Sequence, residues 1–352
     1  MRIIRRYITV HLVWMTFIAL AVLMALFSFF SLINELGKTG VGNYGIPQAL
    51  LYVLLTMPRT AYELFPIAAV VGSMAVLGIM AQNSELDVIR TSGVSRFDLA
   101  VVMVRSGLVL VLIAVVFGEF VAPASEERAQ HLRSMALTNQ ITTNTRYGVW
   151  ARHGDSFINI RKALPGNRVE DVYVYEFDGH NRLRSSVFAK SAEYRDGHWL
   201  MHDIRESVID DQKVVRRDIK EASWGSLLDP DMINLIMVKP QFLAIWELAG
   251  YIRYLRHNAQ NTQLYEQALW TKLIRPFSIL AMIVLAVPLV RGHSRFGSVS
   301  QRVFLGAFAG IIFHLCNQVS DHLGVVYGIS PLVSVLTPTL ILILILAYLL
   351  RE

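Results

Sequence analysis

A short polar stretch between two long apolar segments has the residue pattern of a small capped helix. In it, Ser84 can cap the helix, Glu85 and Asp87 fall in the first turn, and Gly93 follows the end. Negative charge in a first turn interacts favourably with the helix dipole, and glycine is common just beyond a helix. The stretch therefore predicts a two-turn helix over about residues 84–92.

One face of this helix could transmit a movement of a partner protein to the apolar segments on either side of it. Leu86, Ile89 and Arg90 share a face, because their spacing is i, i+3 and i+4. Glu85 would be available to an arginine of that partner. The pattern predicts mechanical coupling, although an ordinary connecting helix fits it equally well.

Polar and ionisable residues also lie near the ends of the apolar segments. They are Asn34, Glu35, Lys38, Glu63, Glu119, Asp321 and His322. Ionisable residues within a membrane span are candidates for function. Near a span end, however, a long side chain can simply reach the headgroup region.

The sequence contains no recognisable catalytic signature. It has no H-E-x-x-H motif, and its ten histidines show no metal-ligand spacing. The stretch 292–298 has the outline of a phosphate loop but lacks the lysine that contacts the phosphates. We therefore predict no catalytic residue, no metal site and no cofactor bound by this chain.

Six apolar segments must position these residues. They are Thr9–Ile33, Arg59–Ala81, Leu99–Val121, Leu273–Val290, Val303–Val319 and Leu332–Leu350. Each has about the length needed to cross ~30 Å of hydrocarbon as a helix. The chain has 352 residues, of which 54% are hydrophobic, above the ~45–50% of soluble domains. Its net charge of +6 does not predict nucleic-acid binding, because the basic residues form no aromatic-interleaved patch.

The basic residues are instead concentrated in the short loops on one side of the predicted membrane, and this distribution predicts the orientation of the chain. One side of the predicted membrane carries Arg2, Arg5, Arg6, Arg90, Arg96, Arg291, Arg295, Arg302 and Arg351. The short loops on the other side carry little positive charge. By the positive-inside rule, both termini are expected in the cytoplasm and the long insert 122–272 outside it. The one cysteine, Cys316, excludes a disulfide within the chain.

The insert changes character from membrane helix to strands and turns. We expect strands at Gly148–Arg152, Phe157–Leu164, Val169–Phe177, Leu183–Tyr194, His198–Ile209 and Val214–Trp224. Asp-Gly pairs at 178–179 and 196–197 between such runs are good hairpin signals. The regular spacing predicts an antiparallel jelly roll or sandwich.

The predicted fold class is thus a polytopic α-helical membrane protein, with three spans on either side of an all-β insert. We expect spans and the short helix in 1–121, the β domain with a helical entry in 122–240, an amphipathic connecting helix in 241–272, and the last three spans in 273–352. The connecting helix has apolar residues at helical spacing. It could lie in the membrane interface or pack on the β domain.

The chain resembles the LptF/LptG permeases of bacterial lipopolysaccharide export, and among them the LptG branch more closely. The likeness is carried by Ala81–Leu86 with Ser92 and Gly93, by Gly118–Pro123, by Tyr251–Leu255 with Tyr265, Trp270, Lys272 and Pro276, and by Val326–Pro331. The length and the order of three spans, insert and three spans fit the family from end to end.

The resemblance implies a transporter half in the inner membrane of a Gram-negative bacterium. In that family, an LptF and an LptG subunit enclose a cavity that takes up lipopolysaccharide among the membrane lipids. Two copies of the ATPase LptB, which bind ATP and Mg, dock on the short cytoplasmic helices. The single-span protein LptC docks beside the first span of LptG, and a periplasmic bridge of jelly rolls receives the lipid.

The resemblance also implies roles for individual residues. Glu85 matches the family glutamate that meets a basic residue of the ATPase, and Leu86, Asp87, Ile89 and Arg90 complete that helix. Lys38 and Arg133 match basic residues that contact lipid phosphates.

Two further family lysines are replaced here by Ser31 and Gly37. Phosphate binding could therefore shift to Arg59 or Arg128, because a positively charged side chain can bind a phosphate from any position that is close enough to it.

Two alternatives to the LptG-type permease remain open. One is a non-transporting anchor that displays a β domain for binding lipid or protein, and the other is the LptF-type half of the same complex. The absence of catalytic motifs makes an enzyme the least favoured class.

Overall fold

The computed structural model describes residues 2–138, 141–142, 149–153, 155–164, 168–178, 180, 182–195, 198–210, 213–224, 240–258, 260–292 and 298–351. The chain divides into two compact units. The first, here called the helical unit, is Met1–Asn34, Val53–Glu126 and Gln263–Glu352. The second, the sheet unit, is Glu35–Tyr52 and Glu127–Thr262. Each unit is described by itself.

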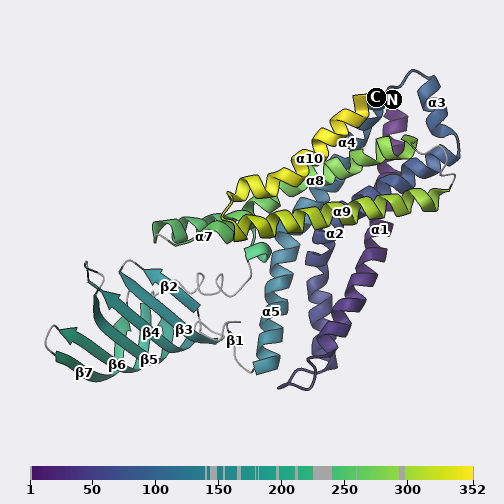
Figure 1. The fold of residues 1–352 in the computed structure, drawn as a ribbon. Helices are drawn as coiled ribbons and strands as arrows, with labels where there is room; N and C mark the ends of the chain where they lie inside the picture. The colour runs from purple at the N-terminus through teal and green to yellow at the C-terminus, as the bar shows by residue number, and fades with distance from the viewer. Residues whose placement is uncertain are drawn as a thin grey trace. The chain divides into compact units, whose positions relative to one another are not determined.

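Long helices dominate the chain (Figure 1). They are α1 (Arg2–Leu36), α2 (Ile46–Gln82), α4 (Arg96–Val116), α5 (Ala122–Thr138), α8 (Gln263–Gly292), α9 (Val299–Val326) and α10 (Pro331–Arg351). The shorter ones are α3 (Glu85–Thr91) and α7 (Ile245–His257), with a 3-10 turn at Pro240–Phe242 and a π-helical segment at Phe117–Val121 that joins α4 to α5. Among the described residues, six helical stretches are long and apolar enough to cross a membrane, as predicted.

Small residues let the helices of the helical unit approach closely. A Cβ on Gly72 of α2 would lie 2.5 Å from the hydroxyl oxygen of Thr16 in α1, and one on Gly306 of α9 would lie 2.7 Å from Met74. Such contacts suit membrane helices, which associate by packing rather than by the hydrophobic effect. α2 is largely buried, whereas α1 and α9 are largely exposed. The exposed apolar faces are available to lipid or to a partner chain.

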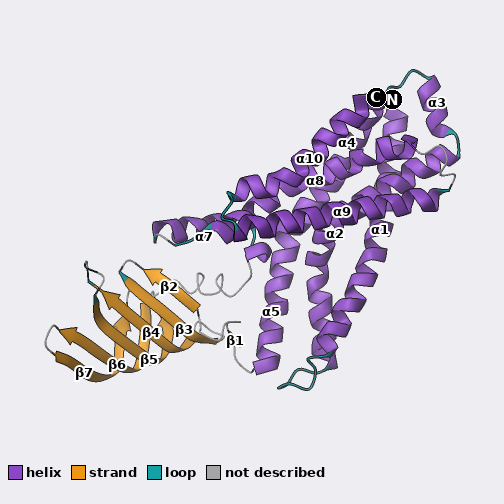
Figure 2. Ribbon diagram, in the orientation of Figure 1, coloured by secondary structure: helices purple, strands orange, loops and turns teal. Residues whose placement is uncertain are grey.

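The sheet unit contains a seven-stranded antiparallel sheet (Figure 2). Its strands are β1 (Ile141–Thr142), β2 (Val149–His153), β3 (Ser156–Leu164), β4 (Arg168–Phe177), β5 (Leu183–Arg195), β6 (His198–Asp210) and β7 (Lys213–Trp224). β3 to β7 pair in sequence order, and β1 and β2 both pair with β3. The prediction of a helical membrane protein with a β insert is therefore confirmed. All the described strands belong to this one sheet, and closure into a jelly roll or sandwich stays a prediction.

One row of charged residues crosses the sheet where the burial pattern changes phase. Along β4, Val172 and Val174 are buried in alternation, but the next buried residue is Val169. β5 shows the same step between its buried residues Ala189 and Ala192. Arg161, Asp171, Lys190, Asp203 and Lys220 lie at this step, each between two paired positions of its strand and outside the pairs of the register. Asp171 and Asp203 have left-handed backbone there.

The segment predicted as one connecting helix over 241–272 forms two helices. α7 ends at His257, where the N–H of Asn258 caps it by donating to the carbonyl of Tyr254, and α8 begins at Gln263. The Tyr254 side chain packs against the sheet core, and its hydroxyl donates a 3.0 Å hydrogen bond to the carbonyl of Arg152. α7 thus packs on the sheet, in agreement with one of the two predicted placements. The turn pair 196–197, Gly179 and the loop 293–297 lie outside the described residues.

Candidate functional site

The predicted coupling helix is present as α3, although its start differs from the prediction. Ser84 has φ +59°, not the extended backbone of a side-chain N-cap, and its carbonyl accepts from the N–H groups of Asp87 and Val88. The helix ends at Thr91, and Gly93 has φ +87°, which glycine adopts without strain.

The two faces of α3 differ in burial. Leu86 is buried and Ile89 partly buried against the core of the helical unit, so these two side chains anchor the helix. Asp87 and Val88 are exposed. Glu85 is held at the edge by Asn83, whose Nδ2 donates to its Oε1 over 3.2 Å. Arg90 lies within α3, and of this residue only the backbone is described.

The next helix, α4, is fixed at its start by a capping box. The Ser95 hydroxyl accepts from the Asp98 N–H at 3.1 Å, and the Ser95 N–H donates to the Asp98 carboxylate at 3.0 Å. α3 is thus followed by a helix whose first turn is closed by hydrogen bonds at both ends of the capping box.

In the sheet unit, a buried carboxylate gathers two of the predicted phosphate-binding residues. Glu35 is only 3% exposed. Lys38 Nζ donates to its Oε2 at 2.9 Å, Arg133 Nε forms an ion pair with its Oε1 at 2.8 Å, and the Tyr44 hydroxyl donates to Oε1 at 2.9 Å. The guanidinium of Arg133 also lies 5.0 Å from the ring centroid of Tyr52. Two cations and one carboxylate leave this group, here called the Glu35 cluster, with one net positive charge.

Tyr44 is a permanent donor in the Glu35 cluster. The residue is 1% exposed, and burial, followed by the hydrogen bond to Glu35, raises the pKa of its hydroxyl. The phenol therefore keeps its proton at every physiological pH.

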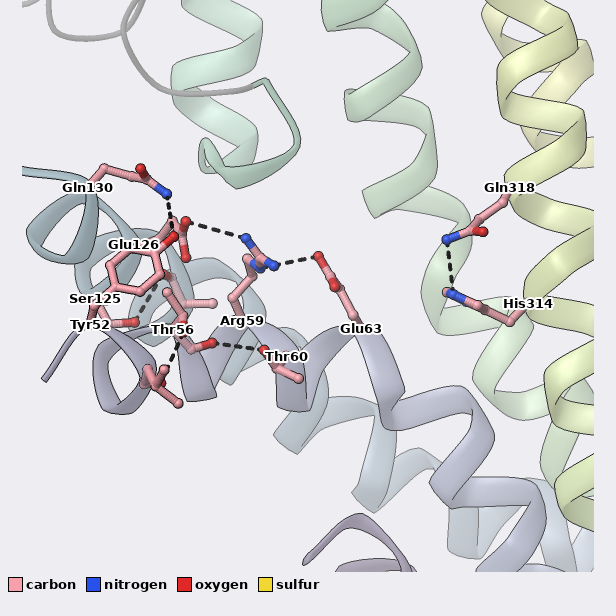
Figure 3. Close-up of polar contacts among 12 residues, drawn as sticks. Tyr52, Thr56, Arg59, Thr60, Glu63, Ser125, Glu126, Gln130, His314 and Gln318 are labelled. Carbon is pink, nitrogen blue, oxygen red and sulfur yellow. Dashed lines mark hydrogen bonds and ion pairs between the residues drawn. The ribbon is translucent and has the colours of Figure 1, made fainter. Parts of the chain in front are cut away.

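Arg59, the third predicted cation, lies between two carboxylates of the helical unit (Figure 3). Its Nε is 3.4 Å from Oε1 of Glu63, and its Nη1 is 3.4 Å from Oε1 of Glu126, which is 1% exposed. These three charges sum to minus one, so Arg59 is a weaker candidate for phosphate than the sequence indicated. Arg128, the fourth, is exposed on α5.

A second buried ion pair lies within the helical unit. Lys272 Nζ lies 3.0 Å from Glu119 Oε1, and the two side chains are 5% and 8% exposed. Glu119 lies in the π-helical segment, where Tyr62 packs so tightly that a Cβ on Gly118 would lie 2.3 Å from the ring. π-helical turns inside helices are frequent at functional sites. The sequence analysis named Glu119 as a polar residue near a span end and Lys272 among the residues that carry the resemblance, but it did not predict their contact across 153 positions.

The described residues contain no group of three or more histidine, cysteine, aspartate or glutamate side chains that could hold a metal ion. Lysine and arginine side chains such as those of the Glu35 cluster are groups that can bind anions.

Comparison with known proteins identifies the family of the chain. A family model described as lipopolysaccharide export system permease LptF/LptG matches residues 6–352. The lipopolysaccharide export system permease protein LptG of Haemophilus influenzae is 29% identical over 349 residues, which cover 99% of this chain and 98% of the relative. The LptG protein of Escherichia coli K12 is 29% identical over 340 residues, or 96% of this chain and 94% of the relative.

Proposed function

We propose that this chain, which belongs to the LptF/LptG family of lipopolysaccharide export system permeases, is the LptG-type half of the transporter that lifts lipopolysaccharide from the inner membrane. The spans hold the subunit in the membrane with both termini in the cytoplasm and the sheet unit in the periplasm. This orientation rests on the sorting of arginine among the short loops.

The observation that carries the proposal is the pair of cations in the Glu35 cluster. Lipopolysaccharide combines many acyl chains with anionic phosphates, so its carrier needs apolar surface and a few well-placed cations. Lys38 follows α1 by two residues, is 42% exposed at its side chain, and shares Glu35 with Arg133. A phosphate that approaches this turn meets both charges at once.

The ATPase proposed as partner would act on α3. Leu86 and Ile89 anchor the helix in the core, while Glu85, Asp87 and the backbone end at Thr91 can face a soluble subunit. We place the hydrolysis of ATP, with its Mg, in an LptB dimer, because this chain shows no motif for nucleotide binding.

The exposed apolar faces of α1 and α9 support further partners within the membrane. We assign them to an LptF-type permease, to the single span of LptC, and to surrounding lipid. A periplasmic jelly-roll bridge would receive the lipid from the sheet unit.

Photocrosslinking of lipopolysaccharide in the assembled complex tests the proposed site. Lys38→Ala and Arg133→Ala should each reduce crosslinking from a probe beside the Glu35 cluster about tenfold, the value of roughly one charge-assisted hydrogen bond. Arg216→Ala, an exposed change in β7, is the matched control. Unchanged crosslinking in both variants would remove the cluster from the lipid path, and a chain that purifies without any ATPase would favour the anchor function.

A further inference from the structure

The Glu35 cluster has a feature that a plain phosphate site does not need, namely a carboxylate at its centre. Both oxygens of Glu35 are engaged, Oε2 by Lys38 and Oε1 by Arg133 and Tyr44. A carboxylate has the same charge sign and the same hydrogen-bond preference as a phosphate oxygen. Glu35 therefore occupies the place that a bound phosphate would take between the two cations.

We propose that Glu35 is an exchangeable internal counter-ion, which competes with lipid phosphate for Lys38 and Arg133 and so weakens capture enough for the lipid to leave again. This inference rests on the proposed function, because it assumes that these two cations meet the lipid. It adds a residue that opposes binding at the same site.

Backbone contacts keep Lys38 and Arg133, the two residues that carry the positive charges, close together. The turn that carries Lys38 is fastened to α5, where the Asn43 N–H donates to the carbonyl of Ala136 at 2.8 Å. At Gly42, φ is +56°, and a Cβ would lie 2.6 Å from the carbonyl oxygen of Leu137, so only glycine allows this approach. Arg133 lies on the same helix, one turn earlier. The cations are thus held near each other whether or not Glu35 binds them.

Burial and exposure differ within the cluster in the way that exchange requires. The Glu35 side chain is 5% exposed, whereas those of Lys38 and Arg133 are 42% and 26% exposed. An anion from outside can therefore reach the cations without displacing the backbone. The carboxylate stays behind when they turn away.

The hydrogen bond from Tyr44 lowers the cost of leaving the Glu35 carboxylate buried when Lys38 and Arg133 move away from it. An unpaired buried charge is costly, and this cost opposes exchange. The Tyr44 hydroxyl donates to Glu35 at 2.9 Å, and this hydrogen bond does not depend on either cation, so Tyr44 can keep it when the cations move. Removal of this neutral donor should tie the cations more tightly to Glu35.

Lipid binding to the full chain in its purified complex tests the exchange. The probes are phosphatidic acid, phosphatidylglycerol and diacylglycerol with identical acyl chains, measured by displacement of a fluorescent lipid. Glu35→Gln keeps the shape and removes the charge, so we expect about 10- to 100-fold tighter binding of both phosphate lipids, the fold-change that corresponds to losing one competing charged hydrogen bond. Binding of diacylglycerol should not change, and release of bound phosphatidic acid should slow in proportion.

Two further variants separate exchange from a structural role. Tyr44→Phe should weaken binding of phosphate lipids severalfold, opposite in sign to Glu35→Gln. Glu127→Gln, the same charge change at an exposed position of α5, should leave all affinities as they are. Glu35→Asp keeps the charge but shortens its reach, so it should tighten binding less than Glu35→Gln does, and it serves if the glutamine variant unfolds at a lower temperature.

The outcomes distinguish this inference from the proposed function. Equal or weaker binding of phosphate lipids by both Glu35 variants would overturn the counter-ion role, even where Lys38→Ala and Arg133→Ala still reduce capture. No effect of those two alanine changes would instead overturn the phosphate site itself. Inorganic phosphate at the same concentration should not displace the lipid, and displacement would show that the cluster serves a free anion.

Discussion

At the scale of single residues, the ion pair of Glu119 and Lys272 is a buried contact within the helical unit. Both side chains are almost fully buried at a separation of 3.0 Å. Removing one partner takes the counter-ion away from the other buried charge, so Glu119→Gln or Lys272→Met alone should lower the free energy of unfolding by about 3–5 kcal/mol.

The double variant Glu119→Gln with Lys272→Met provides the control for this prediction. It leaves neither charge behind, so most of the lost stability should return. Thermal unfolding of the chain in detergent measures all three variants. Losses that simply add in the double variant would show that the two side chains act independently.

Residues whose partners are close along the chain can in principle be paired from the sequence. Glu35 and Lys38 are three positions apart, a spacing at which side chains of a helix meet, and both were named as polar residues near a span end, although their ion pair was not predicted. Their convergence with Arg133 could not be predicted from spacing, because α5 reaches them only through the fold. The contacts of Arg59 with its carboxylates and of Glu119 with Lys272 were not predicted, because they too depend on how the helices pack.

At the scale of elements, the left-handed backbone at the position where burial changes phase is the feature of the sheet that can be tested. Asp203 there has φ +51°, a left-handed backbone that costs most residues energy and glycine almost none. Asp203→Gly should keep or raise the stability of the sheet unit by up to about 1 kcal/mol, whereas Asp203→Val should lower it by about 1–2 kcal/mol.

A glycine at an ordinary strand position gives the opposite sign. Asp218 is exposed in β7, and Asp218→Gly should cost roughly 0.5–1 kcal/mol. Hydrogen exchange of the β5 and β6 amides compares the variants. If both glycine variants lose protection equally, the left-handed backbone does not limit the stability of the sheet.

Secondary structure was predictable wherever the hydrophobic period was regular. Six of the seven strands were predicted to within one or two residues, because alternation and turn residues mark them clearly. The predicted span began at Arg59, whereas α2 begins at Ile46 and contains Pro58 in its interior. The phase step in the sheet was not predictable, because it depends on two aspartates adopting left-handed backbone.

At the scale of the whole molecule, the proposed transport cycle requires that the ATPase move α3 and that this movement displace the bound lipid. Glu85 of α3 accepts two hydrogen bonds at Oε1, from Asn83 Nδ2 at 3.2 Å and from the Tyr7 hydroxyl at 3.5 Å. Glu85→Ala should leave lipid binding intact and reduce transport into the periplasmic acceptor about 10- to 100-fold, the equivalent of losing one charged hydrogen bond to the ATPase. ATP hydrolysis should continue, because its catalytic groups lie in the partner.

Transport and ATP hydrolysis measured together in liposomes test this coupling. Asn83→Ala removes the neighbour but keeps the charge, so transport should fall much less than with Glu85→Ala. Equal losses in the two variants would mean that the shape of the loop matters and the charge does not. Full transport by Glu85→Ala would assign the contact with the ATPase to Asp87 or to the backbone of α3. The buried side chains of Leu86 and Ile89 would then transmit the movement of α3 to the core, although Glu85 would not be the residue on which the ATPase acts.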